Sequence, residues 1–115
     1  MNKFDEKINF YKGQMEKIGI PCEDVLLSKI TKGLGPSIFK RDAASVSTSD
    51  EKEIHTVKHN FLIKKLGLED GAYLDQAIRI VADKMGKTNR VKYRAIFYYL
   101  LVKELKQEFK YIKEP

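Results

Sequence analysis

The chain has 115 residues, of which 43% are hydrophobic and 33% are charged. This is the length of one domain, and we expect residues 1–115 to form a single helical domain. The composition excludes a disordered tail, and the longest apolar run, Ala95 to Val102, is far below the roughly 20 residues that cross a bilayer. We therefore expect a soluble protein without a membrane partner.

The net charge of +6 is concentrated near the C-terminal end of the chain. Residues 1–86 carry 14 basic and 13 acidic residues, whereas residues 87–115 carry 8 basic and 3 acidic residues. One stretch in this second part holds four basic residues and no acid: Lys87, Arg90, Lys92 and Arg94. The basic character is therefore local, and it makes this stretch a candidate anion-binding or nucleic-acid-binding site.

Cys22 is the only cysteine, so the sequence excludes an intrachain disulfide and favours a reducing, cytoplasmic location. The N-terminal residues mix acids and bases and lack the apolar stretch of a signal peptide. Glu23 and Asp24 follow the cysteine directly, and neighbouring carboxylates raise the pKa of a thiol. We therefore do not expect Cys22 to be a nucleophile.

Two helices are predicted in the first third of the chain. The first covers residues 3–18 and ends at Gly19 and Pro21. Its apolar stripe, at spacings of three and four, consists of Phe4, Ile8, Tyr11, Met15 and Ile18. The second covers residues 23–32 with Gly33 as its C-terminal cap, and a short helical piece follows around residues 37–40. The apolar contacts of the second helix are expected from Val25, Leu26, Leu27 and Ile30.

Two further helices are predicted in the middle of the chain. A cap at Ser47, Thr48 or Ser49 precedes a helix that ends near Leu66, with Gly67 as its stop. The next helix ends at Gly86, and its apolar residues again lie at spacings of four, three and four: Leu74, Ile78, Val81 and Met85.

The fifth predicted helix is capped by Thr88 or Asn89 and continues to at least Leu105. Residues 95–102 are apolar around the whole circumference of a helix, which is typical of a helix surrounded by others. No stretch shows the two-residue alternation of a sheet. The sequence thus predicts an all-α fold, a compact bundle of about five helices around a central apolar C-terminal helix.

No motif for a metal, cofactor or catalytic site is complete. His55 and His59 are four residues apart, but the residues between them supply neither a third ligand nor a general base, so packed or solvated histidines are the simpler interpretation. The turn that starts at Gly33 begins like a dinucleotide-binding fingerprint, yet Ile38 stands at the third glycine position and Pro36 removes an amide. We expect no cofactor, no metal and no catalytic residue.

Two interpretations of the basic stretch remain open. In one, Lys87, Arg90, Lys92 and Arg94 bind phosphate or a nucleic acid, and a helix-turn-helix is one form of this idea. A recognition helix needs a free face, however, and this helix is expected to be buried from Tyr93 onward. In the other, favoured interpretation, Arg94 pairs with a distant acid and anchors the central helix.

Three stretches of the sequence resemble a known family: Lys32 to Ile38, Thr56 to Leu68, and Lys92 to Leu101. In this order and spacing, the chain resembles the small bacterial family catalogued as domain of unknown function 2853. The resemblance implies a bacterial, stand-alone, cytoplasmic protein without an assigned activity, and it provides no catalytic motif to transfer.

The leading hypothesis from the sequence is a non-catalytic protein-interaction module that binds another protein or a second copy of itself. The alternative is an anion-binding or nucleic-acid-binding protein that uses the basic stretch. An enzyme assembled from distant residues is the third hypothesis, and no residue in the sequence favours it.

Overall fold

The computed structural model describes residues 2–41, 43–86 and 91–112. Within them the chain forms five α-helices: α1 (Lys3–Lys17), α2 (Asp24–Leu34), α3 (Glu51–Thr56), α4 (Ala72–Met85) and α5 (Arg94–Glu104). Two 3₁₀ helices are η1 (Gly35–Phe39) and η3 (Glu108–Lys110), and the π-helical segment η2 (Val57–Lys65) continues α3. The predicted all-α fold is confirmed.

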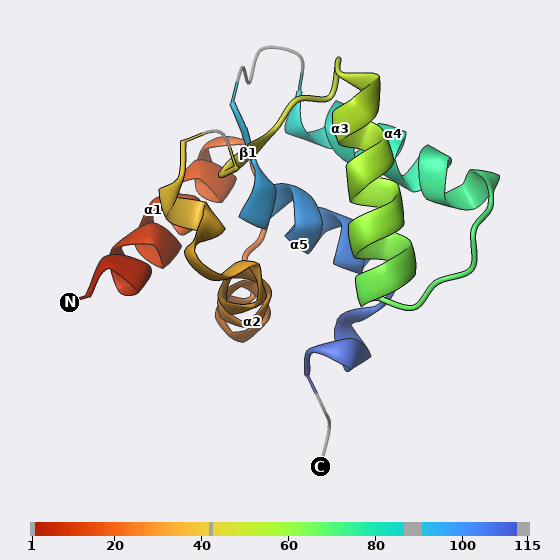
Figure 1. Ribbon diagram of the computed structural model, residues 1–115. Helices are drawn as coiled ribbons and strands as arrows, with labels where there is room; N and C mark the ends of the chain where they lie inside the picture. The colour runs from red at the N-terminus through yellow and green to blue at the C-terminus, as the bar shows by residue number, and fades with distance from the viewer. Residues whose placement is uncertain (1, 42, 87–90, 113–115) are drawn as a thin grey trace.

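Helix α5 lies at the centre of the fold (Figure 1). Every residue from Ala95 to Val102 is buried, as the apolar run predicts. Helices α2 and α4 pack most extensively against α5, and α1 also contacts it. Figure 1 shows α5 between α1 and α2 on one side and the α3–η2 helix and α4 on the other. The apolar faces of the surrounding helices therefore share one core.

The predicted apolar stripes mostly face this core. Tyr11 and Met15 of α1 are fully buried, and Phe4 and Ile18 are partly buried at its two ends. All four predicted residues of α4 are buried as well. Val25 is the exception, because its side chain is 57% exposed on the outer side of α2. The prediction of a core contact for Val25 is wrong.

Helix α2 ends two residues later than its glycines predict. Gly33 lies inside the helix, and the chain turns at Gly35, which has a φ of +65°. Of these two glycines, Gly35 and not Gly33 has the left-handed backbone conformation that glycine adopts without strain. The predicted cap at Gly33 is therefore wrong, whereas the predicted short helical piece is present as η1.

The start and the second half of the third predicted helix also differ from expectation. The cap is Asp50 rather than a preceding serine or threonine, and its Oδ1 accepts the Lys52 N–H at 2.9 Å. After Thr56 the helix widens to π-type hydrogen bonding, which ends where the Leu66 N–H donates to the Phe61 carbonyl at 2.9 Å. Hydrophobic periodicity does not reveal such a change of hydrogen-bond register. Gly67, with a φ of +74°, ends the helix as expected.

A two-residue antiparallel ladder precedes α5. Strand β1 (Ser45–Val46) pairs with β2 (Lys92–Tyr93), with Ser45 opposite Tyr93. The expected caps, Thr88 and Asn89, lie outside the described residues, but α5 itself begins only at Arg94. The predicted helix start is wrong because residues 92 and 93 are held extended by β1, and the Arg94 N–H donates to the Ala44 carbonyl at 2.8 Å.

Tyr11 generates a prediction about stability. Its side chain is fully buried, and its hydroxyl has no hydrogen-bond partner among the described residues. Burial, together with the nearby Tyr93, raises the pKa of Tyr11 to about 12. Because an unpaired buried hydroxyl costs free energy, we expect Tyr11→Phe to leave the free energy of unfolding unchanged or to raise it by about 1 kcal/mol. Urea denaturation measures this, and a clear loss of stability would show that the hydroxyl does have a partner.

Candidate functional site

Arg94 is held by four acceptors of the protein itself. Its Nε donates to the Ala43 carbonyl at 2.8 Å, and one Nη donates to the Tyr98 hydroxyl at 2.9 Å. The other Nη donates to the Ser45 carbonyl at 3.2 Å and forms an ion pair with Glu53. The side chain is only 13% exposed. The pairing with a distant acid that the sequence favours is thus present, and the acid is Glu53.

The surroundings of Arg94 keep it charged and fixed. Burial acts to lower the pKa of Arg94, but the Tyr98 hydroxyl and Glu53 outweigh it and leave that pKa raised. Tyr98 in turn stacks on Phe61 of η2, with ring centroids 3.8 Å apart and an angle of 12° between the rings. Arg94 therefore links β1, α3 and α5. Its N–H groups donate to acceptors within the protein.

Of the other three basic residues predicted from the sequence, Lys92 is described, and it does not lie with Arg94. Lys92 lines a hollow of about 540 Å³ together with Asp75, Arg79 and Asp83 of α4. Lys87 and Arg90 lie outside the described residues. Lys92 and Arg94 thus lie in different surroundings, one beside α4 and one between β1 and α3.

A different basic surface forms where α1, the end of η1 and the residues around β2 meet. Two hollows of about 370 and 480 Å³ lie side by side there and share Lys7 and Phe39. Val91 and Tyr93 border the second hollow. We call this surface the basic aromatic face and define it by Lys3, Lys7, Phe10, Phe39, Lys40 and Arg41.

Large apolar side chains are exposed on this face. Phe10 is 40%, Phe39 48% and Val91 44% exposed. Phe10 meets the ring of Tyr93 edge-on, with centroids 5.1 Å apart and an angle of 87°, and the Lys7 Nζ lies 5.8 Å from the Phe10 centroid. The Phe10 ring thus packs against Tyr93 and remains partly exposed to solvent.

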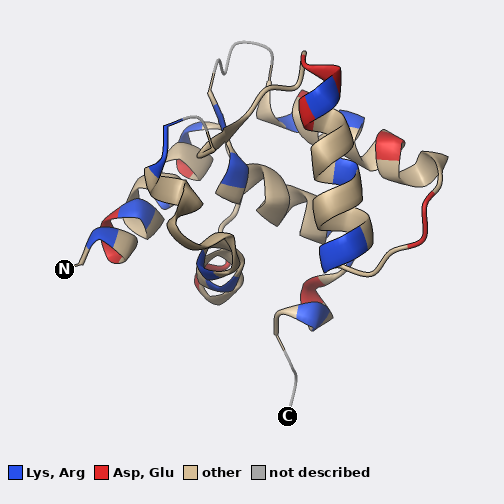
Figure 2. Cartoon of the chain, viewed as in Figure 1, with Lys and Arg blue, Asp and Glu red and all other residues tan. Residues whose placement is uncertain are grey.

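The charge on this face is strongly one-sided. Of the described residues, four cations and one acid, Glu6, line the two hollows. Among the described residues, no acid lies within ion-pair distance of these four cations: Lys3, Lys7, Lys40 and Arg41. Figure 2 shows basic residues both on α1 and on the stretch after η1. The face therefore has a positive charge that remains available to a ligand.

Sequence reasoning missed this face because it is assembled from three segments that are far apart in the chain. Only local hints were present. Lys3, Lys7 and Phe10 follow one another at spacings of four and three, and Phe39-Lys40-Arg41 places an aromatic ring beside two cations.

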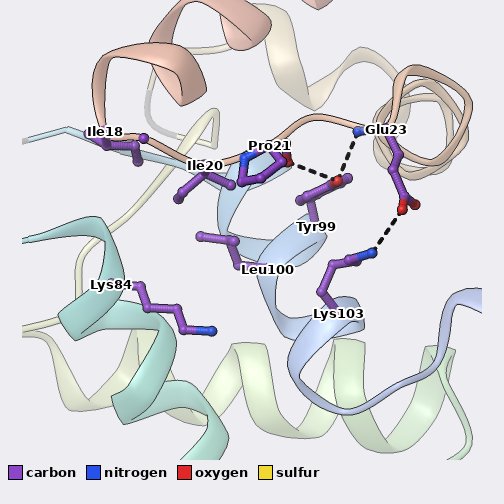
Figure 3. Close-up of a pocket in the computed structure, with 9 residues that line it drawn as sticks. Ile18, Ile20, Pro21, Glu23, Lys84, Tyr99, Leu100 and Lys103 are labelled. Atoms are coloured by element: carbon purple, nitrogen blue, oxygen red, sulfur yellow. Dashed lines mark hydrogen bonds and ion pairs between the residues drawn. The ribbon is translucent and has the colours of Figure 1, made fainter.

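A second surface feature is an apolar groove of about 490 Å³ (Figure 3), lined chiefly by Ile18, Ile20, Pro21 and Leu100. The Tyr99 hydroxyl accepts the Glu23 N–H at 2.9 Å and donates to the Pro21 carbonyl at 3.3 Å, which fixes the segment 18–23 against α5. The lysines at its rim are already paired, Lys84 with Glu104 at 3.1 Å and Lys103 with Glu23 at 3.0 Å. The groove is therefore apolar and nearly neutral.

Neither the two histidines nor Cys22 lines either of these surfaces, although Cys22 stands between two residues of the groove, Pro21 and Glu23. The ring centroids of His55 and His59 lie 4.0 Å apart with the rings tilted by 33°, and the described residues contain no group of three His, Cys, Asp or Glu side chains able to hold a metal ion. Burial, and then Asp24, raises the pKa of the Cys22 thiol, in the direction expected from its neighbours. In the described part of the chain, no helix has the length and apolar character needed to cross a membrane.

The Arg94 network generates a second prediction. Arg94→Ala leaves Glu53 and two carbonyls without their donor, so we expect the free energy of unfolding to fall by about 3 kcal/mol. The matched control is Arg79→Ala on the exposed surface of α4, which we expect to change stability by no more than about 0.5 kcal/mol. Chemical denaturation of both variants measures the difference, and equal effects would contradict an anchoring role.

Comparison with known proteins agrees with the resemblance seen in the sequence. No curated protein matches the chain. The family model described as protein of unknown function (DUF2853) matches residues 10–109, a range that contains helices α2 to α5 and the second half of α1. The chain therefore belongs to the DUF2853 family of proteins of unknown function.

Proposed function

We propose that this protein acts by binding, without catalysis, and that its ligand is a nucleic acid held on the basic aromatic face. The observation that carries the proposal is the set of four cations without ion-pair partners among the described residues, placed beside two exposed phenylalanines. Cations that are not neutralised by the protein can replace the counterions of a phosphate backbone, and this exchange supplies most of the affinity of non-specific nucleic-acid binding.

One residue of the basic stretch found in the sequence is the chain neighbour of a residue that lines this face. Val91 lines the second hollow, and Arg90 precedes it directly in the chain. We therefore retain Lys87 and Arg90 as proposed phosphate ligands. We assign Arg94 a positioning role, since it holds β1 and the start of α5 together, and Lys92 no role at this face.

The chemistry of the face supports binding rather than catalysis. Its described lining contains one carboxylate, Glu6, and neither a histidine nor a cysteine. Histidine is the side chain that general acid–base catalysis uses most often, and cysteine is a strong nucleophile, so the described lining offers a catalytic hypothesis neither of these groups. Lysine, arginine and phenylalanine side chains instead provide charge and apolar surface, which are what recognition of a nucleic acid requires.

Binding of a protein partner, the leading hypothesis from the sequence, becomes the second candidate function. The apolar groove of Figure 3 favours it, because an apolar floor within a rim of charged residues is the usual anatomy of a protein interface. The rim charges neutralise one another, so the expected occupant is an uncharged apolar side chain of the partner.

Charge reversal tests the proposed nucleic-acid binding. If the four described cations make about one phosphate contact each, they alone should make affinity fall roughly 50- to 150-fold between 50 and 200 mM salt, and contacts from Lys87 and Arg90 would make the fall steeper. We expect Lys40→Glu combined with Arg41→Glu to abolish binding of labelled oligonucleotides, measured by fluorescence anisotropy. Lys87→Glu combined with Arg90→Glu should weaken it.

The control is Lys64→Glu combined with Lys65→Glu, an equal change of charge at exposed positions of η2, which should retain most of the affinity. Failure to bind any oligonucleotide at low salt, or an equal loss of affinity in the control variant, would refute the proposal.

Affinity purification from the native cells separates the two candidate functions. We expect nucleic acid to co-purify with the protein and any captured proteins to be released by nuclease treatment. Proteins that remain after nuclease, and that are lost when Ile20→Glu places a charge in the apolar groove, would favour the protein-interaction function instead.

A further inference from the structure

We infer that the basic aromatic face takes single-stranded rather than double-stranded nucleic acid, with unpaired bases stacked on Phe39 and Phe10. This inference rests on the proposed function and names its substrate class. Charge cannot decide between the two forms, because the cations alone would attract single-stranded and double-stranded nucleic acid alike.

The exposed rings decide between the two forms. Phe39 and Phe10 expose 48% and 40% of their surfaces within a field of cations. A duplex would place its charged sugar-phosphate backbone against these rings, since its bases are stacked on one another and covered. A single strand presents the apolar faces of its bases, and stacking on aromatic side chains is the usual way in which proteins bind such strands.

The Phe10 ring packs against two other rings, and the chain at Phe39 is anchored by the buried residue before it. Phe10 is supported by Tyr93 at 5.1 Å and by Tyr11 at 5.9 Å between ring centroids, and both of these tyrosines belong to the core or pack against it. Phe39 directly follows Ile38, which is 2% exposed and anchors the end of η1. A ring that is already packed, as Phe10 is, loses little conformational entropy when a base binds.

Cations line both of the hollows that Phe39 borders. Lys3 and Lys7 line the hollow that Phe10 and Phe39 share, and Lys40 and Arg41 line the neighbouring hollow. Lys7 and Phe39 border both hollows, so a strand that crosses them passes from Lys3 to Lys40 and Arg41 over the Phe39 ring. Alternating charge and aromatic surface matches the alternating phosphates and bases of a single strand.

The experiment compares a labelled oligonucleotide of mixed sequence with the duplex formed by the same strand and its complement, at equal salt. We expect the single strand to bind at least about tenfold more tightly than the duplex. Loss of one stacked base corresponds to roughly a fivefold or larger loss of affinity, so Phe39→Ala and Phe10→Ala should each weaken binding of the single strand by that factor. Neither change should affect binding of the duplex.

Phe109→Ala is the matched control. Phe109 is 63% exposed and has the Lys110 Nζ 5.8 Å from its ring centroid, the same arrangement as Phe10 with Lys7, but it lies in η3. This variant should bind the single strand like the unaltered protein. Circular dichroism should show equal helix content for all three variants, because each ring is exposed.

The outcomes separate the inference from the function on which it rests. Equal affinity for strand and duplex, with no effect of the phenylalanine changes, would overturn the inference and leave the proposed function standing. Binding of neither form at low salt would overturn both. Displacement of the strand by polyglutamate as effectively as by unlabelled strand would show an acidic protein to be an equivalent ligand and would likewise overturn the inference.

Discussion

The anchoring of Arg94 is the interaction on which the rest of the structure depends. A helix that is apolar on all sides has no polar face to fix its rotation or its axial position in the core. Arg94 stands at the first position of α5 and binds Glu53 and the carbonyls of Ala43 and Ser45. A largely buried guanidinium is stable only where all its donors find acceptors. Arg94 therefore defines the position at which the central helix enters the bundle.

The helices could be predicted from the sequence because their apolar faces and stops are encoded locally. The stripe of α1, the stripe of α4 and the apolar run of α5 all face the core as expected. The errors occur where a distant contact decides the outcome. Residues 92 and 93 are extended only because β1 pairs with them, and no feature near them in the sequence indicates this.

The candidate site was less predictable than the fold. The sequence drew attention to Lys87, Arg90, Lys92 and Arg94 because they are close together in the chain. Arg94 instead forms internal bonds, and the exposed cations of α1 and of the residues after η1 meet only through folding. The sequence alone reveals an excess of basic residues. Which of these residues gather on one face depends on the tertiary structure.

The central position of α5 also has a consequence for how the protein is made. This helix follows the other four in the chain, so on the ribosome α1, α2, α3 and α4 are completed before the helix that covers their apolar faces exists. Until residues 94–104 have emerged, these faces are open to other nascent chains or to a chaperone. Productive folding therefore waits until residues 94–104 have been synthesised.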